Sequence, residues 1–199
     1  MKTITVLFLF FLPFVTISQN EIKKNSFNHV VSIAKGDLNK DGMIDSAVVS
    51  QDTIHHLAPY RLEIFFTDSN GKKTLFLQTD KAIEAQYPYG KEQHIYGNGF
   101  DKISIHKGVL WIETGLIRGH FEHKFRFQND TFELIGYTKG NSDGQGKLYL
   151  IDFNLMTGKR IEKIEYYSSN KASEIIEKTV KLKPLPKLKD FEQYSNELF

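Results

Sequence analysis

One short segment, DLNKDGMID at residues 37–45, has the residue types and spacing of a calcium-binding loop. Oxygen donors occupy alternate positions of this segment. Four are side-chain oxygens, and Met43 offers its backbone carbonyl; the five residues are Asp37, Asn39, Asp41, Met43 and Asp45. Calcium takes about six to eight oxygen ligands, and Gly42 permits the sharp turn that gathers these donors around one point. The clustered carboxylates repel one another unless a cation neutralises them. The spacing therefore predicts a calcium site.

The loop differs from an EF-hand at its end and at its flanks. Val48 occupies the position where an EF-hand has a bidentate Glu, and both flanking segments favour strands over helices. Loss of that ligand predicts weak binding, roughly millimolar, which suits extracellular calcium. The alternative is a polar Asp/Asn/Gly turn between two strands, without a metal. Because the loop contains no adjacent base or nucleophile, we expect a bound ion to be structural.

The pattern of strand, GDLNKDGMID and strand, followed by SAVVS, resembles the FG-GAP or VCBS-type repeat of integrin-like propellers and many secreted bacterial proteins. In that family the aspartates of the turn bind calcium, which the resemblance implies for the five donors above. A propeller needs several such blades, and this chain has one copy. The later segments ISIHKGVLWIETGLIRGHFEHKFRFQNDTFELIGYT and DFNLMTGK resemble the second half of small exported bacterial proteins, mostly uncharacterised. This second resemblance implies a fold and a localisation but no activity.

Alternating apolar and polar residues predict strands on both sides of the loop and through most of the chain. In HFEHKFRFQNDTFELIGY, for example, Phe121, His123 and Phe125 share one face, and Asn129-Asp130 forms the turn. Further hairpins are predicted for YRLEIFFTDSNGKKTLFLQT, KISIHKGVLWIET and GKLYLIDFNLMTGKRIEKIEYY. We expect a single, mainly β domain of antiparallel hairpins over residues 19–199, with an α+β arrangement as the alternative.

The C-terminal part of the chain carries the few helix signals. ASEIIEKTVKL fits either a helix or a strand. In the extension at residues 184–199, the spacing of Leu188, Phe191, Tyr194 and Leu198 predicts an amphipathic helix that begins near Asp190. We therefore expect a minor helical element near the C-terminus.

The first 18 residues have the pattern of a secretory signal peptide. Lys2 precedes an apolar run, and Thr16 and Ser18 provide small residues for cleavage after Ser18. We therefore expect export to the periplasm or the extracellular space, with no membrane span after cleavage. The chain has 0 Cys, which excludes disulfides, and its 26 Lys+Arg against 24 Asp+Glu do not favour nucleic acid as a partner.

Aromatic residues form a second candidate site in QYPYGKEQHIYGNGF. Tyr87, Tyr89 and Tyr96 lie in this segment, which Gly and Pro residues interrupt. Trp111 follows 15 positions after Tyr96. Exposed rings on a loop can stack on sugar rings or anchor a partner protein. Alternatively, these rings cover the edge of the β core.

Catalytic and zinc motifs are weak by comparison. His120, Glu122 and His123 do not converge on a zinc ion from a strand, because His123 points away from the other two. The sequence has no G-x-S-x-G motif and no Gly-rich phosphate loop. We predict an exported, non-catalytic binding or structural module with one calcium-stabilised loop and a glycan or protein partner at the cell envelope. The alternatives are an exported glycan hydrolase, whose carboxylates leave no local signature, and a carbohydrate- or protein-binding surface of loop aromatics.

Overall fold

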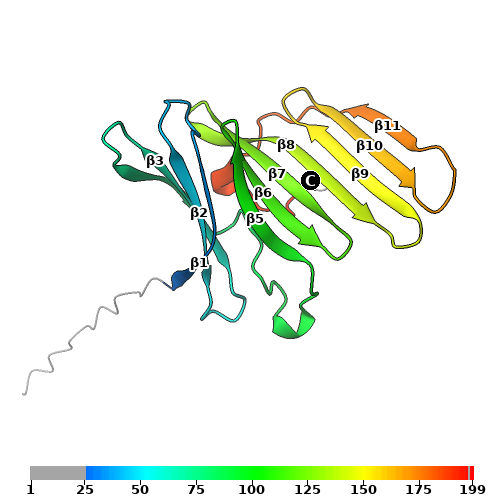
Figure 1. Ribbon diagram of the computed structural model, residues 1–199, viewed down its shortest axis with the longest axis horizontal. Coiled ribbons are helices and arrows are strands. Elements are labelled where there is room, and N and C mark those ends of the chain that lie inside the picture. Colours follow the sequence, from blue (N-terminus) through cyan, green and yellow to red (C-terminus); the bar gives the residue numbers. More distant parts are fainter. Residues whose placement is uncertain (1–25, 197) are drawn as a thin grey trace, which may run out of the picture.

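The computed structural model describes residues 26–196 and 198–199 (Figure 1). The predicted signal peptide lies outside the described residues. The described chain forms two single 3-10 turns, η1 (Lys91–Gln93) and η2 (Leu188–Asp190), and eleven strands. The strands are β1 (Phe27–Gly36), β2 (Asp45–Asp52), β3 (Tyr60–Thr67), β4 (Lys73–Thr79), β5 (Gly99–His106), β6 (Val109–Leu116), β7 (Gly119–Gln128), β8 (Thr131–Ser142), β9 (Lys147–Asn154), β10 (Lys159–Tyr166) and β11 (Glu174–Thr179). The expected mainly β fold is confirmed.

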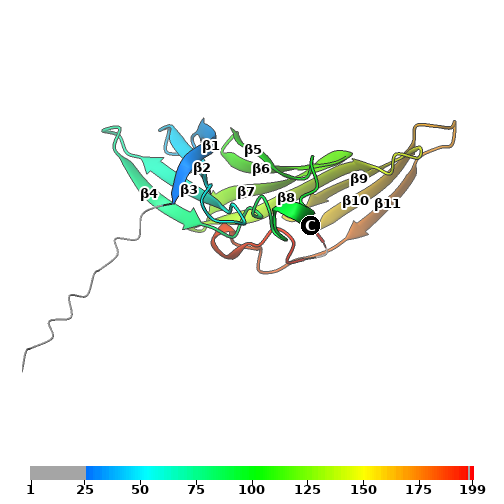
Figure 2. The same ribbon diagram turned by 90° about the horizontal axis from the view of Figure 1, so that it is seen from below.

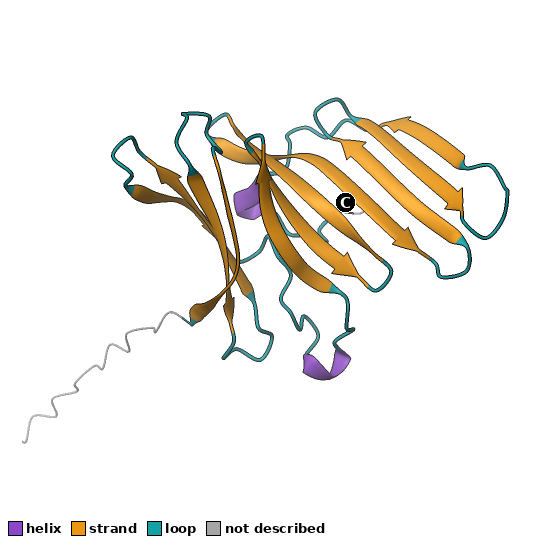
Figure 3. Ribbon diagram, viewed as in Figure 1, coloured by secondary structure: helices purple, strands orange, loops and turns teal. Residues whose placement is uncertain are grey.

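The strands form two antiparallel sheets, in which consecutive strands are neighbours (Figure 3). The smaller sheet has the order β1-β2-β3-β4, and the larger has the order β11-β10-β9-β8-β7-β6-β5. Two of the predicted turns consist of residues with positive φ, namely Lys107-Gly108 (51° and 74°) and Asn129-Asp130 (53° and 56°). Such two-residue turns match the right-handed twist of the strands that they connect. The hairpins predicted from alternation are therefore formed.

The core lies where the two sheets meet. Leu62 and Ile64 of β3 and Phe125 of β7 belong to one continuous buried cluster. Strands β1 and β5 approach so closely that a Cβ on Gly36 would lie 2.5 Å from Cγ2 of Ile105. Alternation thus places one face of each sheet in a shared core, as expected for half-buried antiparallel strands.

The C-terminal strap, defined as residues 180–196 and 198–199, runs along one face of the larger sheet (Figure 2). The predicted amphipathic helix is wrong: the minor helical element in this segment is the single turn η2. The strap is held in extended form because its backbone bonds to the sheets, with the Leu134 amide donating to the Pro186 carbonyl at 2.8 Å. Pro184 and Pro186 also disfavour helix initiation at the residues before them.

The segment that fitted either a helix or a strand forms β11, the edge strand of the larger sheet. All six of its residues are exposed. Figure 1 shows β9, β10 and β11 extending away from the smaller sheet. Among the described residues, no helix has the length and apolar character needed to cross a membrane.

Candidate functional site

The acidic loop connects β1 to β2, whose last and first residues, Gly36 and Asp45, are paired. Its carboxylates organise the loop backbone. The Asp41 amide donates to Oδ1 of Asp37 at 3.2 Å, and the Gly42 amide donates to Oδ2 of Asp37 at 3.0 Å. The Met43 amide donates to Oδ1 of Asp41 at 2.8 Å. The bond from Met43 to Asp41 spans two positions, as in an Asx turn, whereas the bonds to Asp37 close the wider loop.

Asp45 has a different environment from the other loop carboxylates. It is fully buried, and its two oxygens accept hydrogen bonds from the amides of Leu38 and Thr67, both at 2.9 Å. The Thr67 hydroxyl donates in turn to the Ile44 carbonyl at 2.7 Å. Asp45 therefore ties the loop to the end of β3.

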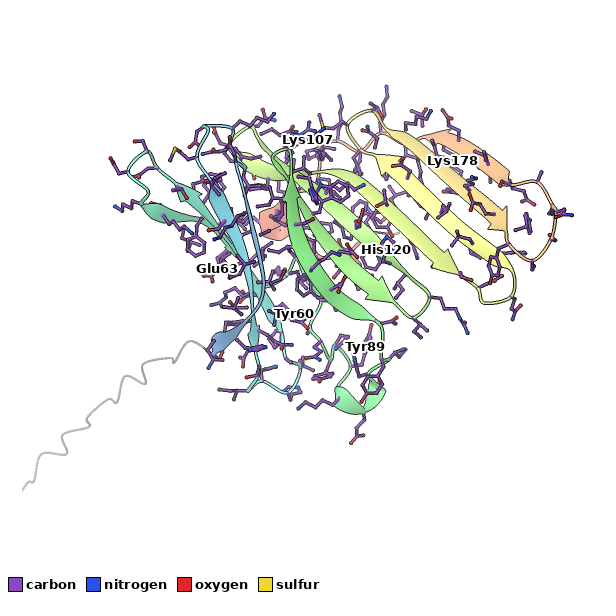
Figure 4. All side chains as sticks on the ribbon, viewed as in Figure 1. Tyr60, Glu63, Tyr89, Lys107, His120 and Lys178 are labelled. Carbon is purple, nitrogen blue, oxygen red and sulfur yellow. The ribbon has the colours of Figure 1, made fainter. Side chains whose placement is uncertain are left out.

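The loop also contacts the turn between β5 and β6. A Cβ on Gly108 of that turn would lie 3.1 Å from the Asp37 carbonyl oxygen. Lys40 of the loop and Lys107 of the turn line a shallow recess of about 280 Å³ at this junction, and Figure 4 shows Lys107 at the turn. The acidic loop thus lies where the two sheets meet.

The predicted calcium ligands remain a prediction. The described residues include no group of three or more His, Cys, Asp or Glu side chains placed to hold a metal ion. The predicted set also draws on the Asn39 amide and the Met43 carbonyl. Oδ1 of Asn39 accepts the Asp41 amide at 3.1 Å, and Nδ2 of Asn39 donates to Oδ2 of Asp41 at 2.8 Å. Asn39 and Asp41 are therefore adjacent in the loop.

Three of the predicted aromatic residues lie together on the loop between β4 and β5. Tyr89 and Tyr96 are 75% and 88% exposed, and Figure 4 shows Tyr89 on this loop, away from the sheets. His94 makes edge contacts with both Tyr87 and Tyr96, at centroid distances of 5.1 and 5.2 Å. The Tyr87 amide donates to the Leu57 carbonyl at 3.0 Å, which fixes the loop to its neighbour.

Tyr89 borders a small polar recess of about 110 Å³. The other lining residues include Tyr194 of the strap and several hydrogen-bonding side chains, namely Glu84, Gln86, Gln93, His94 and Asn98. Glu84 and Tyr194 also line an adjacent cleft of about 390 Å³ together with Asp80 and Glu192. Burial raises the pKa of Glu84. Burial, and then the nearby Glu84, raise the pKa of Tyr194 to about 12. We call these two hollows the tyrosine cleft.

Trp111 lies apart from the other predicted aromatic residues. It is on β6, where the Lys124 ammonium lies 4.1 Å from the ring centroid and His106 makes an edge contact at 5.6 Å. Its indole nitrogen is buried with no hydrogen-bond partner among the described residues. Trp111 is near the three tyrosines in the sequence, but it does not line the tyrosine cleft.

His123 lies on the buried face of β7. Its side chain is fully enclosed, and neither ring nitrogen has a hydrogen-bond partner in the described part of the chain. The Phe191 and Tyr137 rings lie 4.8 and 5.1 Å away. Burial lowers the pKa of His123 to about 3. His120 is exposed on the opposite face of β7 (Figure 4), as strand alternation predicts.

A further cavity, of about 330 Å³, lies between the larger sheet and the strap. Its apolar lining includes Phe121, Ile151 and Phe199, and its polar lining includes Arg160 and Lys139. Sequence reasoning missed this strap cavity because its walls come from β6 to β10 and from the last residues of the chain. Only the alternation of β7, β8 and β9 indicated which of their side chains face inward.

Comparison with known proteins gives no relative: no family model, no curated protein and no solved structure matches the chain.

Proposed function

We propose that this protein is an exported, non-catalytic binding module that takes a carbohydrate at the tyrosine cleft. The observation that carries the proposal is the exposed ring of Tyr89, which lines a hollow with several polar side chains, together with the exposed Tyr96 on the same anchored loop. Most large aromatic rings in a domain of this kind are buried, because their burial contributes strongly to the core.

The residue types at the cleft suit a sugar better than an apolar ligand. A sugar ring presents C–H groups that pack on a tyrosine face, and hydroxyls that need both donors and acceptors. Gln86, Gln93 and Asn98 supply both, whereas Glu84 supplies acceptors when ionised. The side-chain nitrogen Nε2 of Gln51 donates to Oε1 of Gln86 at 2.7 Å, which holds the Gln86 side chain in place. Such preorganisation reduces the entropy lost on binding.

Glycan hydrolysis is a second candidate, favoured by one observation. Glu84 has a raised pKa and lines the same cleft as Asp80 and Glu192, as a general acid beside a second carboxylate would. Both potential partners are already in ion pairs. Asp80 accepts two bonds from Arg61 at 2.7 and 2.8 Å, and Glu192 lies 3.3 Å from Lys81. We therefore favour binding over hydrolysis.

The experiment is a glycan array probed with the exported protein, followed by calorimetry with the best ligand. The double variant Tyr89→Ala/Tyr96→Ala should weaken binding at least about tenfold, since exposed aromatic anchors carry much of the energy of an interface. Tyr167→Ala is the matched control, because Tyr167 is 60% exposed elsewhere on the molecule.

Equal losses in the double variant and the control, or no glycan bound at all, would contradict carbohydrate binding at this cleft. Release of reducing ends that disappears in Glu84→Gln would favour the hydrolase instead.

We also propose that the acidic loop holds calcium as a structural clamp. Asp37 and Asp41 form no ion pair in the described part of the chain, so their charges lack a neutralising side chain. A carboxylate oxygen that accepts one amide retains a second lone pair for a cation. Asp45 is the least available ligand, because both of its oxygens are buried and bonded. Export would supply the calcium concentration that a weak site requires.

A further inference from the structure

The strap cavity combines apolar residues with two cationic groups, one buried and one half-buried. Leu116, Phe121 and Ile151 line it from the larger sheet, and Leu198 and Phe199 line it from the strap. Its volume of about 330 Å³ lies within the range of small-molecule sites, roughly 300–1,000 Å³. A hollow with this lining suits the hydrocarbon part of a ligand.

Arg160 is the first cationic group of the cavity and is only 7% exposed. Its Nε donates to Oε1 of Glu162 at 2.8 Å, and its Nη1 donates to the Leu198 carbonyl at 2.5 Å. A guanidinium has five N–H donors, so these two bonds leave other donors of this cavity-lining side chain unused. Arginine presents such donors as a planar fork that matches a carboxylate.

Lys139 of β8 is the second cationic group, and it forms no ion pair within residues 26–196 and 198–199. Glu162, the carboxylate that Arg160 contacts, also pairs with Lys178 at 3.1 Å. Among the described lining residues, Arg160 and Lys139 carry positive side-chain charges, and no Asp or Glu side chain lines the cavity. A partly buried excess of positive charge favours an anionic ligand.

We propose that the strap cavity binds an aliphatic carboxylate of the fatty-acid type. The carboxylate lies against Arg160 and Lys139, and the hydrocarbon chain lies among Phe121, Ile151 and Phe199. The site is distinct from carbohydrate binding at the tyrosine cleft, although Tyr194 borders both hollows. The two cationic side chains select an anionic head group, and the apolar wall selects the hydrocarbon chain.

Calorimetric titration of the purified protein with three probes tests the charge and the chain separately. Dodecanoate should bind once per chain, dodecylammonium should bind at least about tenfold more weakly, and acetate should give no measurable heat. Replacement of Lys139 by Gln should weaken dodecanoate binding about tenfold, as expected for the loss of one charge-assisted contact. Lys139→Gln is the main variant because Lys139 forms no ion pair with any residue that the structure describes.

Arg126→Gln is the matched control, because Arg126 lies on β7 and faces away from the cavity. It should leave dodecanoate binding unchanged, whereas Ile151→Trp should abolish it by filling the cavity. Equal affinity for dodecanoate and dodecylammonium, no binding of dodecanoate, or equal losses in Lys139→Gln and Arg126→Gln would overturn the proposal. These comparisons decide the matter even if Ile151→Trp fails to fold, and none of them depends on glycan binding.

Discussion

The acidic loop and the strap cavity differ in the distance along the chain over which each is built. The loop takes its groups from nine consecutive residues, and most of its hydrogen bonds join residues two to seven positions apart. The cavity brings residues of β6 to β10 against the end of the chain, and the bond from Arg160 to Leu198 spans 38 positions. Local geometry is therefore visible in the sequence, whereas a cavity depends on how distant segments pack.

The two regions also carry opposite charge excesses. The loop concentrates carboxylates at an exposed turn, and the cavity concentrates cations on an apolar wall. Water screens the loop charges, so a weakly bound ion is sufficient there. The partly buried charges of the cavity are screened less, so that their partner is expected to be more specific. This comparison predicts that changes at the strap affect the whole fold and that changes at the exposed residues of the loop act locally, whereas the buried Asp45 belongs with the core.

The largest effect is expected when the strap loses its main buried side chain. Phe191 is 3% exposed and packs on His123 and Phe125, with centroid distances of 4.8 and 5.1 Å. Phe191→Ala should lower the free energy of unfolding by about 3–5 kcal/mol, measured by denaturant titration. Tyr194→Ala, at a strap residue that is 56% exposed, should have a smaller effect, about 1 kcal/mol. Equal effects would show that the strap is not part of the core.

The second-largest effect on the unfolding free energy is expected at Asp45, through which the loop contributes to the wider fold. Asp45→Ala would leave the amides of Leu38 and Thr67 without their acceptor, which should cost about 2–4 kcal/mol of unfolding free energy. Asp41→Ala in EDTA should have an effect below about 1 kcal/mol, because Asp41 is exposed. A small loss in Asp45→Ala would remove the distinction between the anchored end and the exposed end of the loop.

Calcium should produce an effect of intermediate size that depends on concentration. At a 100-fold excess over the dissociation constant, a ligand that binds the folded state alone adds about 2.7 kcal/mol to the unfolding free energy. Thermal melts in millimolar calcium and in EDTA should therefore differ for the native chain and coincide for Asp41→Ala. Identical melts of the native chain in both solutions would refute the clamp, and magnesium provides a control for ionic strength.

The smallest effect, about 1.5–2 kcal/mol between pH 6.5 and pH 5, is expected from protonation of His123 in the core beneath the strap. Its pKa of about 3 in the folded state lies below the usual unfolded value of about 6.5, so the unfolded state binds the proton more strongly. Its contribution to stability is therefore fully present above pH 6.5 and is lost as the pH falls towards 3, by up to about 1.4 kcal/mol per pH unit.

His123→Phe should remove this part of the pH dependence, measured as the difference between unfolding free energies at pH 6.5 and pH 5. His120→Phe is the control, because His120 is exposed on the other face of β7. The same pH dependence in the native chain and in His123→Phe would contradict the buried neutral imidazole.

Most of the strands could be predicted because alternation and turn chemistry act over a few residues. In β7, Phe121 and Phe125 alternate with polar residues, and the Asn129-Asp130 turn adopts the positive φ values that its residue types tolerate. The C-terminal helix was predicted from the same kind of periodicity and is wrong. There the apolar residues pack one by one on the larger sheet, and backbone bonds to β8 replace the helical ones.

The candidate sites divide in the same way. The tyrosines of the loop between β4 and β5 could be proposed from their composition, but the hollow that Tyr89 lines also needs Tyr194 of the strap, 105 positions further along the chain. The sequence also did not predict that Trp111 lies outside the tyrosine cleft. The position of a residue on a sheet is set by strand register and not by its distance along the sequence.

The sequence by itself determined the hairpins, the antiparallel β class and the polar loop at residues 37–45, because short-range sterics and side-chain period decide these features. Only the tertiary structure decided the extended strap, the burial of His123 and the pairing of Arg160 with the end of the chain. These features arise when the closing of two sheets around one core removes particular groups from water, and that selection depends on all the segments at once.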